Sequence, residues 1–354
     1  MIPATHPMAR AVPPRFVEDI YTPDEIELLF GIVRNDGPWR LIAAQHFNTA
    51  EEYLAVAGAK NRDTDVKLEL SDLLTPTFRG YLGDQGVPFI EKAQDLYYNT
   101  RLLDMIKTIH GGKFAFPTNY TFNVRAPAHS YDAGHLDGTS FRGMTMQNTP
   151  LWLIGIMAKS GLFEHWEFKT GQVIAYFYNS DVDGGFTFWP DGPDRAPQRF
   201  AAPFHNSGLL MNAERIFHRG EASGPVSKRS IPGLQLNSVV SGDGADEWVI
   251  RNDGQEIARY HNDDMRLLFH YSAYVFDDLA DVKRYLDHTD NLTRDRVFEM
   301  FIDDLDARGV SYTRPSDPMN DEEFKAVLAR TYAMAPSSYP EEAPLDVPGK
   351  SSQV

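Results

Sequence analysis

The stretch TNYTFNVR, residues 118–125, is the first of a series of short β-rich runs that decide the fold. Its aromatic and β-branched residues are typical of strands, and turn-forming Gly, Pro, Asn and Asp residues separate it from the runs that follow. The later runs are LWLIGIMA (151–158), QVIAYFYN (172–179), GFTFWP (185–190), SGLLMNA (207–213), LQLNSVV (234–240), EWVIR (247–251), EIARY (256–260) and LLFHYSAYVF (267–276). This pattern predicts an antiparallel sandwich or barrel over residues 118–276.

The segments on either side of this core are predicted to be helical. Residues 1–117 form a mainly helical region, with one helix beginning at Thr22-Pro23-Asp24-Glu25 and a second from about Phe89 to Gly111. Residues 277–340 contain two amphipathic helical patterns, and the Pro-, Ser- and Glu-rich residues 341–354 are predicted to be disordered. The fold class is therefore a mainly β core with α flanks.

Composition restricts the classes of partner. Lys plus Arg total 34 against 50 for Asp plus Glu, a formal charge of −16, so neither nucleic acid nor a membrane surface is expected as a partner. The chain has no cysteine, which excludes disulfides and thiolate metal sites. It has no apolar run long enough for a membrane span, and its start lacks the apolar core of a signal peptide. We expect a cytoplasmic protein, and a homodimer remains open.

The segment SYDAGHLDGTSFRG, residues 130–143, contains His135 and Asp137. Residues i and i+2 of a strand project from the same face, so these two side chains can occupy adjacent positions on one metal ion. Two histidines and one carboxylate are the ligand set of non-haem Fe(II) oxygenases. Three other pairs compete. His261/Asp263 falls in a polar turn, His288/Asp290 lies between two helical segments with Asp290 as a helix cap, and His165/Glu167 follows a β run.

The segment IFHRGEASGPVSKRSI, residues 216–231, favours the first pair. His218 follows an apolar run and is a candidate for the third ligand. Arg229 comes eleven residues later in a β-like run, from which a guanidinium can reach the same cavity and bind a carboxylate bidentately. Because strand residues alternate, Lys228 then points to the opposite face.

These motifs resemble the Fe(II)/2-oxoglutarate-dependent dioxygenase superfamily, in particular its prolyl-hydroxylase-like branch. The resemblance covers residues 118–232: an H-x-D strand, then YFYNSDVDGGFTFWPDGPD (176–194), then H-R-G and a basic residue. It implies a double-stranded β-helix (jelly-roll, cupin-like) with iron at His135, Asp137 and His218. It also implies that Arg229 binds the distal carboxylate of 2-oxoglutarate. The candidates for an assisting tyrosine are Tyr120, Tyr131, Tyr176 and Tyr178.

The resemblance further implies an oxygenase that uses Fe(II), 2-oxoglutarate and O2. Such an enzyme oxidises a C–H bond of a small organic molecule, most simply by hydroxylation, and releases succinate and CO2. Desaturation, ring formation and epoxidation use the same centre, so the reaction type and the substrate stay open. The alternatives are a metal-dependent cupin-like dioxygenase without 2-oxoglutarate and a non-catalytic β-sandwich that binds a ligand.

Overall fold

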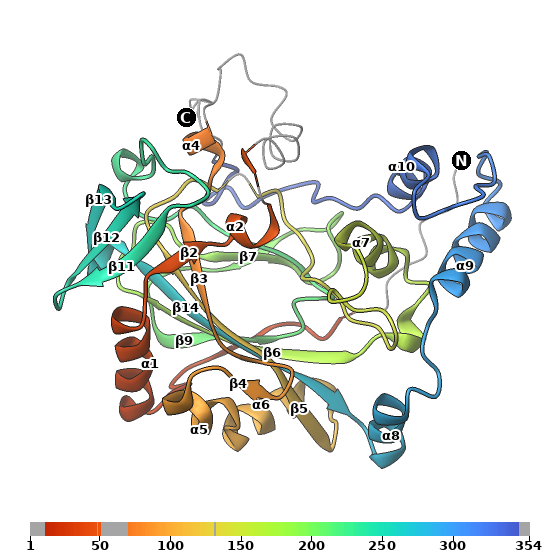
Figure 1. Cartoon of the computed structure of the whole chain (residues 1–354), viewed down its shortest axis with the longest axis horizontal. Helices are drawn as coiled ribbons and strands as arrows, with labels where there is room; N and C mark the ends of the chain where they lie inside the picture. The colour runs from red at the N-terminus through yellow and green to blue at the C-terminus, as the bar shows by residue number, and fades with distance from the viewer. Residues whose placement is uncertain (1–10, 48, 51–69, 131, 347–354) are drawn as a thin grey trace.

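A computed structural model describes residues 11–47, 49–50, 70–130 and 132–346. The core is mainly antiparallel β-sheet, with helices on its surface (Figure 1). In spatial order the larger sheet contains β1 (Arg15–Val17), β9 (Phe204–Met211), β6 (Lys169–Tyr178), β14 (Arg266–Phe276), β5 (Phe114–Arg125), β3 (Thr77–Asp84), β2 (Trp39–Leu41), β11 (Val239–Asp243), β12 (Glu247–Asn252) and β13 (Gln255–His261). A short strand, β4 (Val87–Pro88), pairs with β3.

A smaller sheet has the order β10 (Phe217–Gly220), β7 (Phe186–Trp189), β8 (Gln198–Phe200). An isolated antiparallel bridge between His135 and His218 adds the segment around residue 135 to the free side of β10. The chain therefore passes repeatedly between the two sheets, from β5 to the 135 segment, to β6, to β7 and β8, to β9, to β10 and finally to β14.

The two faces of the larger sheet have different chemistry. On one face, Phe122 and Val124 of β5 and Phe269 of β14 pack with buried side chains of α1 (Pro23–Asn35) and α6 (Thr100–His110). Figure 1 shows both helices below the sheet. The alternate residues Asn123 and Arg125 are polar and line a cavity on the other face. Strand alternation thus separates a dry helix-covered side from a polar interior.

The helix predicted to begin at Thr22 is confirmed. The Thr22 hydroxyl accepts from the backbone NH of Glu25 at 3.3 Å, and the Glu25 carboxylate accepts from the NH of Thr22 at 2.8 Å. This reciprocal arrangement is a capping box. The single helix predicted from Phe89 to Gly111 is wrong. The segment forms η1 (Glu91–Ala93), α5 (Gln94–Tyr97) and α6, because Asn99 accepts from the NH of Arg101 at 3.0 Å and starts a new helix.

The first 117 residues also contain strands. β1 to β4 and the beginning of β5 lie there, so this region belongs to the larger sheet as much as to the helices. The run 151–158, predicted as a strand, is the helix α7 (Leu151–Ser160). It is apolar nearly all round, and such a short run gives no periodicity that separates a strand from a buried helix.

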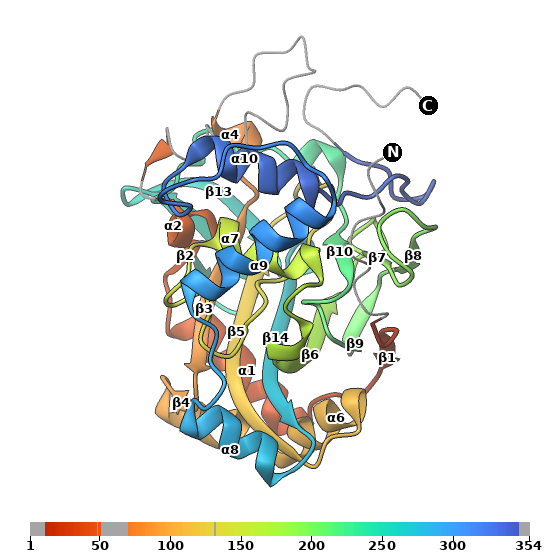
Figure 2. The same cartoon turned by 90° about the vertical axis from the view of Figure 1, so that its right-hand side faces the viewer.

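The two helical patterns predicted after Asp277 form α8 (Leu279–Asp287) and α9 (Arg294–Ala307). A third helix, α10 (Glu322–Thr331), follows them and had not been singled out from the sequence. Helices α7, α9 and α10 share a second hydrophobic cluster, and Figure 2 shows them together on the side of the molecule that faces the viewer. Residues 341–346 are placed against the core, whereas 347–354 lie outside the described residues. Of two further short helices, α2 (Ala43–His46) follows β2 along the chain, and α4 (Leu70–Leu73) precedes β3. Within the described ranges, no helix is long and apolar enough to cross a membrane.

Candidate metal centre and its cavity

The backbone brings the three predicted ligands to one place. The NH groups of His135 and His218 each donate to the other residue's carbonyl at 3.0 Å. Two residues further on, the NH of Asp137 donates to the carbonyl of Ala213 at 3.0 Å. Gly134 precedes His135 with a φ of +106°, in the region that favours glycine, and a Cβ there would lie 3.1 Å from the Trp189 ring. The pairing of the 135 segment with β10 therefore sets the spacing of the two imidazoles.

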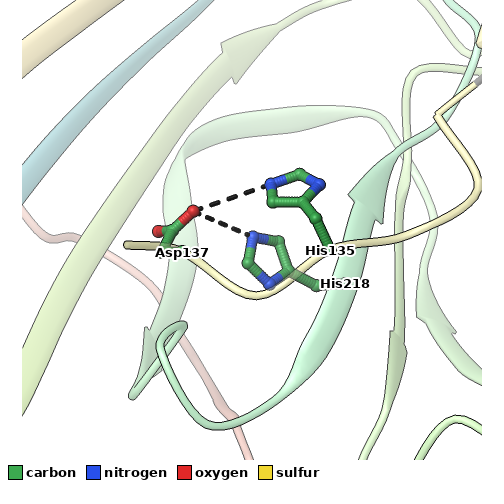
Figure 3. Close-up of side chains that lie close together, drawn as sticks. All are labelled: His135, Asp137 and His218. Carbon is green, nitrogen blue, oxygen red and sulfur yellow. Dashed lines mark ion pairs between the residues drawn. The ribbon is translucent and has the colours of Figure 1, made fainter. Parts of the chain in front are cut away.

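The three side chains converge on one point (Figure 3). The Nε2 atoms of His135 and His218 each lie 3.6 Å from Oδ1 of Asp137. One donor atom from each residue falls within 4.8 Å of the other two, which is close enough for the three to hold one metal ion. The described part of the chain contains no other such group of three.

The second nitrogen of each imidazole already has a partner. His135 Nδ1 lies 2.6 Å from Oδ2 of Asp132, and His218 Nδ1 lies 2.9 Å from the carbonyl oxygen of Ile216. Metal-bound histidines have this arrangement, in which an oxygen at one nitrogen fixes the ring and leaves the other nitrogen for the ion. The contact with Asp132 was not predicted, although Asp132 lies only three residues before His135.

The charges around the centre favour a cation. Loss of water disfavours a charge on Asp137, yet the neighbouring imidazoles outweigh it and hold the pKa of this carboxyl well below its usual range. For His135 the same penalty is outweighed by Asp132 and Asp137, which raise the pKa of the imidazole to about 10. Burial and the nearby His135 lower the pKa of His218. A proton thus sits among two carboxylates where a divalent cation can replace it, so the donor set fits a metal.

A cavity of about 620 Å³ opens from this centre, and all three residues contribute to its wall. Its floor is the polar face of the larger sheet. Neighbouring strands place Arg125 of β5 directly opposite Arg266 of β14, and Asn123 opposite Leu268. Tyr176 of β6 lies opposite Leu268 on its other side. The volume is in the range of small-molecule sites.

Arg266 is a cavity residue that the sequence interpretation missed. It is 3% exposed, its Nε donates to the carbonyl of Gly184 at 2.9 Å, and its guanidinium lies 4.4 Å from the centre of the Tyr176 ring. Its Nη2 is buried and has no hydrogen-bond partner among the described residues. His270 lies four residues further along β14, and its Nε2 is likewise buried without a hydrogen-bond partner among the described residues. Burial lowers the pKa of His270 to about 4, so its ring is neutral.

Arg229, the residue predicted to bind 2-oxoglutarate, lies outside the wall of this cavity. It follows the 3-10 helix η3 (Val226–Lys228), so the prediction that it belongs to a strand is wrong. Its guanidinium binds Asp183, Asp346 at 2.7 Å and the carbonyl of Gly224 at 2.9 Å, and it is not in the wall of the 620 Å³ cavity. Lys228 is 47% exposed in its side chain and binds Asp264 at 2.7 Å. The chain turns between Gly224 and Arg229 instead of continuing as a strand.

Of the tyrosine candidates, only Tyr176 lines the cavity among those that the structure describes. Tyr120 points to the helix-covered face, where its hydroxyl donates to that of Tyr21 at 3.0 Å. The Tyr178 hydroxyl donates to the carbonyl of Val182 at 2.9 Å. Tyr131 lies outside the described residues.

The competing pairs have other contacts. Asp290 is not a helix cap, since Thr293 caps α9 and Asp290 binds Arg142 at 2.8 Å. Glu167 binds Arg215 at 2.7 Å. His261 and Asp263 are exposed in the predicted turn, with His261 at the end of β13.

No protein-family model matches the chain, and no curated protein matches it. Among solved structures, the chain is similar to the crystal structure of an oxidoreductase of the 2OG-Fe(II) oxygenase family from Burkholderia pseudomallei. The two chains are 12% identical with a TM-score of 0.31, and the match covers 64% of this chain and 81% of that chain. So weak a likeness establishes neither a shared fold nor a shared activity, and the assignment below depends on the site itself.

Proposed function

We propose that the protein is an Fe(II)- and 2-oxoglutarate-dependent oxygenase that acts on a small organic molecule in the 620 Å³ cavity. The observation that carries this proposal is the convergence of His135 and His218 Nε2 on one oxygen of Asp137, at 3.6 Å each. Two imidazoles and one carboxylate on a single face leave the remaining positions of an iron ion for other ligands. The sequence resemblance described above points to the same chemistry.

The same proposal identifies the core as a double-stranded β-helix. In support, four strands of the larger sheet lie in the order β9-β6-β14-β5, and the smaller sheet extends to four with the 135 segment. The chain crosses from one set to the other as it proceeds, and closing two such sets around a cavity is the jelly-roll arrangement. His135 and His218 then lie side by side on neighbouring strands of the smaller set.

Within this site we assign the distal carboxylate of 2-oxoglutarate to Arg266 instead of Arg229. Arg266 is buried in the cavity wall with an unpartnered Nη2, which is the state expected of a guanidinium that awaits an anion. Tyr176 stacks against this guanidinium and holds it in place. Arg229 has its own carboxylate partners.

Iron held by this centre would activate O2, the oxidant, and 2-oxoglutarate would be the co-reductant that is oxidatively decarboxylated to succinate and CO2. The contribution of the chain is to hold and orient. Asp132 and the carbonyl of Ile216 fix the two imidazole rings, and Arg266 sets the position of the cosubstrate at the other end. The remaining cavity surface places the substrate.

Formation of succinate and CO2 from 2-oxoglutarate tests the proposal. The purified protein is incubated with Fe(II), 2-oxoglutarate and O2, and turnover in the absence of substrate is followed with isotopically labelled 2-oxoglutarate. We expect succinate from the parent and none above background from Asp137→Ala, whereas Asp263→Ala retains the parent level. Iron binding without 2-oxoglutarate binding would instead favour the cupin-like dioxygenase, and absence of iron binding would favour a non-catalytic protein.

A further inference from the structure

We propose that the substrate of this oxygenase carries an acidic group, a carboxylate or a phosphate, and that Arg79 binds it. This inference depends on the proposed function in one respect, namely that the cavity beside the metal centre is the active site. It goes further in naming the chemical class of the substrate and the residue that selects it.

Among the described residues, the cavity wall holds two arginines without a carboxylate partner, Arg79 and Arg266. The two carboxylates of the same wall are Asp132 and Asp137. Both carboxylates are engaged by the histidines of the metal centre. A chain with a net charge of −16 therefore gathers guanidinium groups in one interior. Charged groups that leave water need counter-charges, and a bound anion can supply one to Arg79 and to Arg266.

The cosubstrate balances only part of this charge. Its distal carboxylate goes to Arg266 in the assignment above. Arg79 lies on β3, opposite Asn123 of β5, and the next strand beyond β5 is β14 with Arg266. Two strand spacings, roughly 10 Å, thus separate the strand of Arg79 from that of Arg266. A cavity of about 620 Å³ also exceeds what a five-carbon diacid fills, so a second molecule has room beside it.

Arg79 is held in a way that leaves its binding face available. Its Nε donates to Oδ1 of Asn123 at 2.9 Å, which fixes the plane of the guanidinium. Among the described residues it forms no ion pair with a carboxylate, and its two terminal amino groups have no hydrogen-bond partner. A planar guanidinium whose two terminal amino groups are free can bind a carboxylate or a phosphate bidentately.

The surroundings of Arg79 connect it to the metal centre. The charge of Arg79 contributes to lowering the pKa of His270, and the charge of Asp137 opposes this effect, so His270 lies within electrostatic reach of both. His46, at the end of α2, also lines the cavity, and burial together with Arg79 lowers the pKa of its imidazole. A neutral His46 can donate one hydrogen bond to an anion bound at Arg79. An acid held there extends its carbon skeleton past His270 towards the three ligands.

The test compares small carboxylic acids with their own primary amides. Each pair has the same shape and differs in charge, so the ratio of their affinities measures recognition of the acid. Binding is measured by calorimetry under anaerobic conditions with Fe(II), both with and without 2-oxoglutarate, for the parent and for Arg79→Gln. We expect acids that bind the parent at least about tenfold more tightly than their amides, a difference of about 1.4 kcal/mol. In Arg79→Gln the ratio should fall to about one, while the affinity for 2-oxoglutarate stays within about threefold of the parent.

Arg40→Gln is the matched control. Arg40 lies opposite Arg79 on β2, is exposed and does not line the cavity, so its removal changes the net charge equally and leaves every residue of the cavity wall in place. It should keep the acid–amide ratio of the parent. The proposal is overturned if acids and amides bind the parent alike, if no acid binds, or if the preference survives in Arg79→Gln. Failure of 2-oxoglutarate to bind would overturn the proposed function instead, because the measurement without it still reports on Arg79.

Discussion

Arg229 and Arg266 are both buried, with exposed fractions of 7% and 3%, but their partners differ. Arg229 binds two carboxylates and a carbonyl, which leaves it with no need of a ligand. Arg266 binds one carbonyl and the face of Tyr176, and its Nη2 is unpartnered within the described ranges. The chain itself therefore supplies the partners of Arg229, whereas Arg266 keeps an amino group without a described partner.

Arg266→Gln should weaken 2-oxoglutarate binding strongly. Removing one partner of a buried charge pair costs about 2–5 kcal/mol, which corresponds to at least about tenfold in affinity. Arg229→Gln is the counterpart, and it should leave the affinity for 2-oxoglutarate within about threefold of the parent. Calorimetric titration of the anaerobic iron-loaded proteins measures both. A large loss in Arg229→Gln with little change in Arg266→Gln would restore the sequence-based assignment.

Asp132→Asn should weaken metal binding without removing a ligand. The carboxylate of Asp132 orients His135 through Nδ1 at 2.6 Å, and loss of such a partner typically costs about 10–100-fold in metal affinity. Competition with a chelator of known affinity gives the change. Asp263→Asn, beside the exposed His261, is the control and should match the parent. Equal metal affinity in Asp132→Asn and the parent would show that Asp132 does not position the ring.

At the scale of elements, residues 336–346 support the segment that carries His135. The Tyr339 hydroxyl donates to the carbonyl of Ala133 at 3.0 Å, and the NH of Asp346 donates to the carbonyl of Ser130 at 3.0 Å. The Asp346 carboxylate also binds His129 at 2.8 Å and Arg229 at 2.7 Å. The prediction of disorder for residues 341–354 is therefore wrong for 341–346, whose composition gave no sign of these long-range contacts.

Asp346→Ala should destabilise the fold and spare the metal centre. Arg229 would lose one of its two carboxylates while staying buried, at a cost of about 1–3 kcal/mol in the free energy of unfolding. Urea titration of the metal-free protein measures this cost. The expected iron stoichiometry equals that of the parent, because no ligand changes. Unchanged stability in this variant would mean that the segment is not held by the contacts seen here.

At the scale of the whole molecule, the sequence predicts what is local. The β-rich runs of the core, the start of α1 at Thr22 and the spacing of His135 and Asp137 each depend on a few neighbouring residues. Arg266 could not be found this way. Its place depends on the register of β14 against β5, and on β11 to β13, which separate it in sequence from His218. The sequence instead predicts Arg229, which has the expected spacing from His218 but lies on a turn.

Metal binding should stabilise the whole fold, since the ligands come from two segments that are far apart in the sequence. A ligand at 100 times its dissociation constant adds about 2.7 kcal/mol to the free energy of unfolding if it binds only the folded state. Anaerobic Fe(II) should therefore raise the melting temperature of the parent and of Asp263→Ala by several degrees. Asp137→Ala should show little or no rise. An equal rise in Asp137→Ala would place the stabilising metal elsewhere.

The central claim is that His135, Asp137 and His218 hold one iron ion. It is tested most directly by the iron content of protein reconstituted anaerobically with Fe(II) and freed of excess metal. His218→Ala removes one ligand from the centre, whereas His261→Ala removes an exposed imidazole in the turn after β13. The account predicts about one iron per chain for the parent and for His261→Ala, and close to none for His218→Ala. Full iron content in His218→Ala, or its loss in His261→Ala, would contradict the assignment.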